Sequence, residues 1–455
     1  MNPDAPVLTG ILGGRMGAHA RPGGLWFRVG PWAFVALLLN YLILMARQLP
    51  CEIGGQTNYL AGCYSDIRVL WFWRGLQDGQ MPYLQYQQVE YPVLTGAFME
   101  LGRQLVMLLG GKSEAGVSPA DAIYASHLFM GVNAVLVFIL LAVLVWVHLK
   151  LARPQTALMI AVSPAIATTA LINWDALVIT LTALTLLAWA RRKQVLSGVF
   201  LGLAISAKLY PLLLLGPMLV LALRTGKWKA FATTAIATLA SWLAVNLPVY
   251  FLAPQAWLYF WTFNVGRGAD LGSLWYALEL AGIKIPGLSL IESILLIFGA
   301  LLIGGLLLFA PRRPRLSQGV FLIVALFLVV NKVYSPQYVL WLLPLLVLAR
   351  PRWLDWLIFS VAETAYFVAI WAHLDGVLAA GDTSGKFYWL AVFFRVGVTL
   401  WLMSRVIVDI FRPAGDVYRA EGADDPDGGV FDRAPDAEWL QQARQDQQAL
   451  ESARQ

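Results

Sequence analysis

Apolar runs long enough to cross a lipid bilayer as helices recur along nearly the whole of this chain. A hydrocarbon core about 30 Å thick requires roughly 20 apolar helical residues per crossing. With 59% hydrophobic and only 13% charged residues among 455, the chain lacks the polar surface that a soluble domain of this size needs. It is therefore predicted to be an all-α, multi-pass integral membrane protein. Twelve spans are predicted, at residues 31–46, 127–149, 156–171, 176–190, 195–207, 209–223, 230–250, 289–310, 320–330, 338–348, 353–371 and 389–410.

Basic residues cluster at every second junction between these runs, which is typical of the cytoplasmic side of a membrane protein. The clusters are Lys150 with Arg153, Arg191 to Lys193, Arg224 with Lys227 and Lys229, Arg312 with Arg313 and Arg315, Arg350 with Arg352, and Arg405 with Arg412. The alternation requires that residues 93–109 lie along the outer surface or re-enter the membrane. The alternative is an ordinary span there and an irregular topology.

On the first interpretation, residues 51–126 form one large outer loop. Residues 64–77 then form a helix along the interface, where Trp71, Phe72 and Trp73 are typical interfacial side chains. Residues 1–30 are predicted to be a cytoplasmic N-terminal segment, residues 31–411 the transmembrane domain, and residues 412–455 an acidic, mostly disordered cytoplasmic tail. The net charge of +6 suits anionic membrane lipids better than nucleic acid, so no nucleic-acid partner is expected.

The outer loop holds the charged residues that the apolar runs around it almost entirely lack. Within its first part, residues 51–92, these include Asp66, Asp78 and Glu90, together with Arg68 and Arg74. Charge retained beside a bilayer usually has a function. The loop is therefore the first place to look for one.

Both cysteines of the chain, Cys51 and Cys63, lie in this loop. An oxidising compartment would permit a disulfide between them. The alternative is two small unpaired residues at the interface. Their spacing is not a metal-binding CxxC pattern.

Other polar residues fall at the outer ends of the spans and are expected to line one outward-facing cavity with Asp66. They are Asn173, Trp174, Asp175, Lys208, Tyr210, Arg267, Asp270, Asn331, Lys332, Tyr334, Gln337, Tyr338, His373 and Asp375. Isolated Lys and Arg side chains beneath an acidic loop suit a ligand with a phosphate, a polar head and an apolar tail. A carboxylate beside it could deprotonate a hydroxyl nucleophile. This combination is the chemistry of lipid-linked sugar transfer.

Four segments then resemble a known family. They are residues 65–96, 172–184 (INWDALVITLTAL), 197–215 (SGVFLGLAISAKLYPLLLL) and 331–346 (NKVYSPQYVLWLLPLL). In order and spacing they are similar to GT-C glycosyltransferases, and among these to glycosyltransferase family 87, the actinobacterial polyprenyl-phosphate-mannose-dependent α-mannosyltransferases. The resemblance runs from about residue 31 to residue 410 and covers neither tail.

The resemblance implies a plasma-membrane enzyme that transfers mannose, with inversion, from polyprenyl-phosphate mannose to a glycolipid or lipoglycan hydroxyl on the extracytoplasmic side. The acidic base that the family carries soon after its first span corresponds to Asp66. The alternative for Asp66 is an ion pair with Arg68 or Arg74. Lys208 is a candidate for the donor phosphate or a lysine extending to the interface, and Arg267 and Lys332 are rival phosphate ligands or solvated loop charges.

The candidate sugar and acceptor contacts have structural alternatives as well. Glu90, in a turn with Tyr91, either binds a sugar hydroxyl or pairs with a loop arginine. Asp175 either contacts sugar or caps a helix. The remaining candidates, common at interfaces without any ligand, are Asn173, Tyr210, Tyr334, Gln337 and Tyr338.

No metal or other cofactor is required on this interpretation, because lysine and arginine can stabilise a phosphate leaving group. Two other functions stay open. One is a GT-C enzyme that uses another polyprenyl-phosphate sugar, such as arabinofuranose. The other is a transporter or flippase of lipid-linked sugars, which is expected to show repeated halves; no such repeat is visible.

Overall fold

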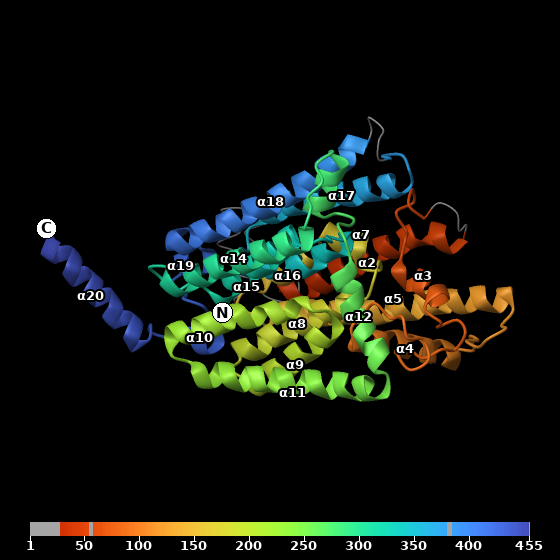
Figure 1. Cartoon of the computed structure of the whole chain (residues 1–455), viewed down its shortest axis with the longest axis horizontal. Helices are drawn as coiled ribbons and strands as arrows, with labels where there is room; N and C mark the ends of the chain where they lie inside the picture. Colours follow the sequence, from red (N-terminus) through yellow and green to blue (C-terminus); the bar gives the residue numbers. More distant parts are fainter. Residues whose placement is uncertain (1–27, 54–57, 380–384, 455) are drawn as a thin grey trace.

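The computed structural model describes residues 28–53, 58–379 and 385–454, and over these residues it is a bundle of helices joined by short loops (Figure 1). Most of the predicted N-terminal segment, residues 1–27, lies outside the described residues. The first half of the bundle contains α2 (Val29–Ile53), α3 (Asp66–Trp73), α4 (Val93–Leu108), α5 (Pro119–Leu149), α6 (Gln155–Ala161), α7 (Pro164–Thr169), α8 (Asp175–Ala190), α9 (Gln194–Ala207), η2 (Tyr210–Leu214) and α10 (Leu215–Thr225). The second half contains α11 (Trp228–Leu252), α12 (Pro254–Gly266), α13 (Leu274–Leu280), α14 (Leu288–Phe309), α15 (Leu316–Val330), η3 (Pro336–Tyr338), α16 (Val339–Ala349), α17 (Trp353–Leu374), α18 (Gly385–Phe411), η4 (Pro413–Gly415), α19 (Val417–Ala420), η5 (Gly429–Phe431) and α20 (Glu438–Arg454).

Six of the described helices are long and apolar enough to cross a membrane: α2, α5, α11, α14, α17 and α18. Six shorter apolar segments lie at Gln155–Thr169, Asp175–Ala190, Gln194–Ala207, Tyr210–Thr225, Leu316–Val330 and Pro336–Ala349. Each of the twelve overlaps one predicted span. The chain is thus an all-helical membrane protein, and the number of helices that cross the bilayer stays a prediction.

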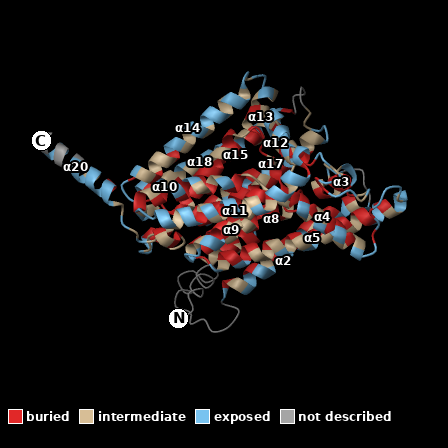
Figure 2. Ribbon diagram, turned by 60° about the horizontal axis from the view of Figure 1, so that its bottom comes forward, coloured by how far each residue is buried: buried red, intermediate tan, exposed pale blue. Residues whose placement is uncertain are grey.

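The shorter helices form much of the interior (Figure 2). The closest approach is between α9 and α11, where a Cβ on Gly198 or Gly202 would lie 2.4 Å from the carbonyl oxygens of Thr234 and Thr238 respectively. Small residues at such a spacing let two membrane helices pack backbone against backbone. This packing fixes the end of α9, which carries Lys208.

Helix α2 continues past residue 46, where the predicted span ended. Arg47 and Gln48 are helical, and Arg47 donates to the carbonyl oxygens of Ala167 at 3.0 Å and Thr168 at 2.9 Å. These hydrogen bonds to α7 give partners to Nε and Nη2 of a side chain that would otherwise favour ending the helix in water.

Helix α3 is shorter than the interfacial helix predicted at residues 64–77, and its three aromatic residues do not share one environment. Trp71 is buried, with its ring centre 4.9 Å from that of Phe129 on α5, whereas Phe72 and Trp73 are exposed. Trp71 therefore anchors α3 on the bundle.

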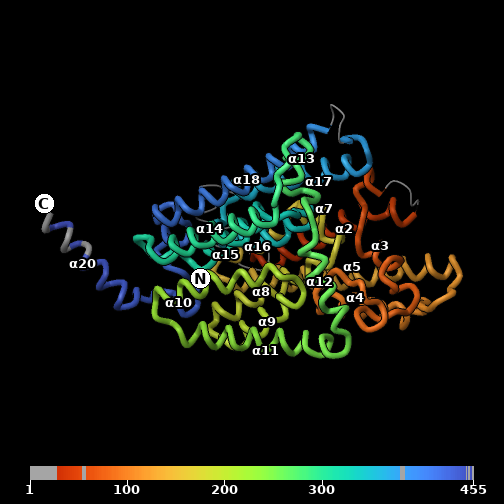
Figure 3. Tube along the Cα trace, viewed as in Figure 1, coloured from red at the N-terminus to blue at the C-terminus, as the bar shows by residue number. Residues whose placement is uncertain are grey.

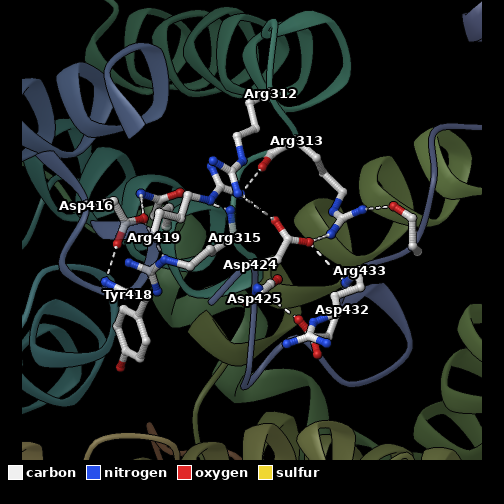
Figure 4. A network of polar contacts seen from close by, with 12 residues as sticks. Arg312, Arg313, Arg315, Asp416, Tyr418, Arg419, Asp424, Asp425, Asp432 and Arg433 are labelled. Atoms are coloured by element: carbon white, nitrogen blue, oxygen red, sulfur yellow. Dashed lines mark hydrogen bonds and ion pairs between the residues drawn. The ribbon is translucent and has the colours of Figure 1, made fainter. Parts of the chain in front are cut away.

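The C-terminal segment is folded, which differs from the mostly disordered tail that its composition predicted. Figure 4 shows the central network, in which Asp424 pairs with Arg313 and lies 3.3 Å from Arg419. Asp416, which is almost fully buried, pairs with Arg315 at 2.8 Å. Charges that would keep an isolated tail solvated are thus neutralised by arginines from other parts of the chain.

This tail marks one end of the bundle, and α3 and α4 lie at the other (Figures 1 and 3). Helix α8 connects the two. Asp175 begins α8, and Trp189 in its last turn donates to the Gly428 carbonyl oxygen at 2.8 Å and packs on Phe431. With 16 residues, α8 separates its two ends by roughly 24 Å.

Candidate functional site

Asp66 is the first residue of α3 and is tied to the loop before α8. Its backbone nitrogen donates to the Ile172 carbonyl oxygen at 2.7 Å, and the neighbouring Ser65 hydroxyl donates to the Leu171 carbonyl oxygen at 2.5 Å. These bonds bring the outer loop, distant in sequence, against the start of α8. They place the Asp66 carboxylate beside Asn173.

The two carboxylate oxygens of Asp66 have different partners. The Tyr64 hydroxyl donates to Oδ1 at 2.9 Å, and the Asn173 amide donates to Oδ2 at 2.9 Å. Asn173 also donates to the Tyr91 hydroxyl at 2.8 Å. The alternative in which Asp66 pairs with Arg68 or Arg74 is not what the structure shows, since those arginines pair with Glu52 and Glu90.

Burial raises the pKa of the Asp66 carboxyl above its ordinary value. The hydrogen bonds from Tyr64 and Asn173 and the positive charge of Lys208 act in the opposite direction without cancelling the effect of burial, and the charge of Asp175 adds to the rise. A carboxylate with a raised pKa is a stronger base than an ordinary aspartate. Asp66 therefore has the position and the basicity to accept a proton from a hydroxyl.

Lys208 follows the last residue of α9 in an extended conformation, where the chain breaks before η2 and Pro211. Its Nζ lies 3.5 Å from Oδ1 of Asp175, and the same oxygen accepts from Nε1 of Trp341 at 2.6 Å. The other oxygen of Asp175, Oδ2, is buried without a hydrogen-bond partner among the described residues. A short helix break is tolerated at membrane depth only where it is buried in protein or lines a cavity.

Three aromatic rings surround the Lys208 ammonium. Its Nζ lies 5.2 Å from the ring centre of Tyr91, 5.8 Å from that of Tyr338 and 5.7 Å from that of Trp341. Trp341 stacks on Tyr338 at 3.7 Å and on Tyr210 at 4.5 Å. Such rings attract a cation through their π faces and hold Lys208 in place.

The structure thus gathers most of the predicted residues into one cluster, which we call the Asp66–Lys208 cluster: Asp66, Tyr91, Asn173, Asp175, Lys208, Tyr210 and Tyr338. Sequence reasoning missed Tyr64 and Trp341. Tyr64 lies two residues before the candidate base, and this closeness in sequence could have identified it. Trp341 lies in an apolar run, where a tryptophan normally reads as core.

Three predicted charged residues have other partners. Arg74 binds Glu90 through two hydrogen bonds of 2.7 and 2.8 Å. Arg267 is paired with Asp270, at 2.5 Å. Lys332 donates to the Ser289 hydroxyl at 3.2 Å and lies 3.9 Å from Glu292. The single cavity that was expected to hold all these cations is therefore not observed.

Tyr334, which precedes η3, belongs to a separate buried group with residues of α17 and α18. Its ring lies 3.4 Å from the guanidinium carbon of Arg395, which pairs with Glu363 at 2.9 Å. Gln337 is buried, and its Oε1 has no hydrogen-bond partner in the described part of the chain. Neither residue contacts Asp66 in the structure.

The two cysteines, Cys51 and Cys63, form a disulfide that joins the end of α2 to the segment before Asp66. Across residues 28–53, 58–379 and 385–454, no three His, Cys, Asp or Glu side chains are grouped so that they could hold a metal ion. The positive charge of Lys208 lowers the pKa of the Asp66 carboxyl.

Residues 119–336 match the model of glycosyltransferase family 87. The matched segment includes Asn173, Asp175, Lys208 and Tyr210, whereas Asp66 and Tyr91 lie before it. No curated protein matches the chain.

Proposed function

We propose that this chain, which belongs to glycosyltransferase family 87, is an inverting enzyme that transfers mannose from polyprenyl-phosphate mannose to a hydroxyl of a glycolipid or lipoglycan. The observation that carries the proposal is the Asp66–Lys208 cluster. It places a basic carboxylate and a cation close together at one end of a helical membrane bundle. Transfer from a lipid phosphate needs both groups.

In the proposed reaction, the acceptor hydroxyl oxygen attacks the anomeric carbon of the donor sugar. The hydroxyl proton passes to Asp66, the bond between the anomeric carbon and the phosphate oxygen breaks, and polyprenyl phosphate leaves with the electron pair. One displacement inverts the anomeric configuration. Tyr64 and Asn173 orient the carboxylate through their hydrogen bonds to Oδ1 and Oδ2.

Lys208 supports the donor side of this reaction. An ammonium group stabilises the negative charge that grows on a departing phosphate, and the break between α9 and η2 brings it to the same cluster as Asp66. The unpartnered Oδ2 of Asp175 is proposed to accept a hydrogen bond from a sugar hydroxyl. Arg267 and Lys332, which have other partners, are secondary candidates for the phosphate.

The proposed active side is extracytoplasmic, in a plasma membrane. Arginines from four of the basic junctions contact the C-terminal tail: Arg153, Arg224, Arg315 and Arg352. The positive-inside rule assigns this end to the cytoplasm. Asp66 contacts the opposite end of α8 and would then face outward.

The test is mannose transfer from radiolabelled polyprenyl-phosphate mannose in membranes that contain the wild-type chain, Asp66→Asn or Asp78→Asn at equal expression. Asp78 is an exposed acid of the same loop and serves as the matched control. We expect transfer by the wild type and by Asp78→Asn and near-complete loss in Asp66→Asn. Transfer retained in Asp66→Asn would remove Asp66 from the chemistry.

The same membranes distinguish the competing donors. If the wild type transfers nothing from the mannose donor but transfers arabinofuranose from its polyprenyl phosphate, the donor assignment is wrong and the reaction class stands. If it moves a lipid-linked sugar across sealed vesicles without forming a glycosidic bond, the chain is a transporter.

A further inference from the structure

A cavity lies beside the Asp66–Lys208 cluster and was not anticipated from the sequence. Its volume is about 280 Å³, near the lower end of the range for small-molecule sites. Its walls come from the end of α2, from the disulfide-bonded segment and from α3, and they include Gln48, Glu52, Tyr64, Arg68 and Val69. We call it the α2–α3 cavity.

Gln48 offers a hydrogen-bond donor, unpaired among the described residues, at the wall of this cavity. The side chain is 2% exposed, and its Nε2 has no hydrogen-bond partner in the part of the chain that the structure describes. A buried amide donor left unsatisfied costs about 1–3 kcal/mol. A ligand oxygen in the cavity, such as a sugar hydroxyl, would remove that cost.

The charges on the cavity wall favour a neutral ligand over a phosphate. Arg68 pairs with Glu52 at 3.1 Å, and His127 contacts the other oxygen of the same carboxylate. Because Glu52 offsets the positive charge of Arg68, these two residues present a paired acid and base to the cavity, with no excess of positive charge between them. A carboxylate beside a guanidinium offers acceptors and donors together, which suits a polyhydroxylated group.

Tyr64 connects the cavity to the reaction centre. It lines the cavity, and its hydroxyl donates to Oδ1 of Asp66 at 2.9 Å. The other oxygen, Oδ2, accepts a hydrogen bond from Asn173, which also donates to the Tyr91 hydroxyl. The ring of Tyr91 in turn lies beside Lys208. The base therefore lies between the α2–α3 cavity and the aromatic group that holds the Lys208 ammonium.

We propose that the α2–α3 cavity binds the sugar head group of the acceptor, so that acceptor and lipid-phosphate donor reach Asp66 from separate compartments. This inference rests on the proposed glycosyl transfer and deepens it by locating the acceptor. Phe72 and Trp73, both exposed, form part of the cavity wall and offer apolar surface to the lipid part of the acceptor. The Cys51–Cys63 disulfide joins two walls of the cavity.

Two binding probes separate the compartments without requiring turnover. The first is radiolabelled n-octyl α-D-mannopyranoside, a neutral sugar on an apolar chain, and the second is geranylgeranyl phosphate. Each is titrated against the purified full chain in lipid nanodiscs, for the wild type, Gln48→Leu and Val69→Trp. Gln48→Leu removes the amide, and Val69→Trp fills the cavity from α3 with a bulky side chain.

We expect both variants to weaken octyl mannoside binding about tenfold, which matches the loss of one well-made hydrogen bond to a buried donor. Geranylgeranyl phosphate affinity should stay within about twofold. Gln104→Leu, the same substitution at an exposed glutamine of α4, is the matched control and should change neither. The retained phosphate affinity shows that the variants are folded.

Octyl mannoside affinity unchanged in both variants would overturn the proposal, as would displacement of octyl mannoside by geranylgeranyl phosphate. An equal loss of affinity for both probes would also overturn it, because it would mean that the two probes share one site. A failure of the proposed function looks different. In that case, the wild type binds octyl mannoside at the cavity but forms no glycosidic bond with any polyprenyl-phosphate sugar.

Discussion

Replacing Lys208 by methionine separates its role in folding from its role in turnover. The ammonium lies 3.5 Å from Asp175, whose side chain is 1% exposed. Without Lys208, that carboxylate keeps one hydrogen bond, from Trp341. Breaking a buried ion pair by removing one partner costs about 3–5 kcal/mol. Lys208 is 13% exposed and its contact with Asp175 is not tight. We therefore expect Lys208→Met to lower the free energy of unfolding by an amount near the lower end of this range.

The double variant Lys208→Met with Asp175→Asn decides between the two roles. The amide is neutral and its oxygen can still accept from Trp341, so the double variant should recover most of the lost thermal stability. It should stay well below the turnover of Asp175→Asn alone, which is the reference for any loss of the Asp175 contact to sugar, because the departing phosphate still lacks its cation. Losing one such group from a catalytic site typically costs about 10²–10³ in kcat.

The assay pairs the melting temperature of the purified protein with kcat/KM for polyprenyl-phosphate mannose. Lys227→Met, at an exposed lysine, is the control and should change neither quantity. The reasoning is refuted if the double variant regains wild-type turnover, since Lys208 would then act only by neutralising Asp175. It is also refuted if Lys208→Met alone is fully active.

Four further outcomes follow from the same contacts. As the pH is lowered, the kcat/KM of the wild type should begin to fall at a pH above the ordinary aspartate pKa of about 3.9. The reason is that burial raises the pKa of Asp66 and only the ionised carboxylate accepts a proton. A fall that begins only at or below that value contradicts the assignment of Asp66 as the base. Turnover should survive EDTA, because Lys208 supplies the positive charge, and a loss that Mg²⁺ restores would refute this. Glu90→Gln should leave kcat/KM within about threefold of the wild-type value. It should lower the free energy of unfolding by about 1 kcal/mol or less, because it removes a partly exposed ion pair with Arg74. A larger loss of kcat/KM would indicate that Glu90 contacts the substrate. Asp425→Asn should raise the melting temperature at pH 7.5 and raise it by about half as much at pH 5. Burial raises the pKa of Asp425 from 3.8 to about 6, so the cost of keeping this carboxyl in the packed tail grows between these two pH values and is complete above pH 6. An equal change at pH 5 and pH 7.5 would contradict this.

The positions of the apolar helices could be predicted from the sequence, because a membrane imposes a length and an apolar composition on each of them. The break at Lys208 was also visible, since Pro211 follows a lysine between two apolar runs. Asp66 was identified as a candidate from its place in the charged outer loop and from the family resemblance, and Asn173 from its position at the outer end of a span. Their hydrogen bond to each other depends on how the loop packs, which no local pattern encodes.

The partners of the other charged residues could not be predicted for the same reason. Arg267 pairs with Asp270 three residues later, and this spacing was available in the sequence. Lys332 meets Glu292, which is distant in sequence on α14. Gln48 lies just beyond the predicted span that ends at residue 46, and only the tertiary structure shows that its amide is buried at a cavity.

The folded tail bears on the orientation argument itself. Several arginines that the positive-inside rule counts, including Arg224 and Arg315, are buried against Asp436 and Asp416 and offer no free charge to a lipid surface. The rule depends on the residues present during insertion rather than on their final partners, and exposed lysines such as Lys193 and Lys227 stay available to anionic headgroups. We therefore expect the tail end to be cytoplasmic, and Asp66, at the far end of α8, to act outside.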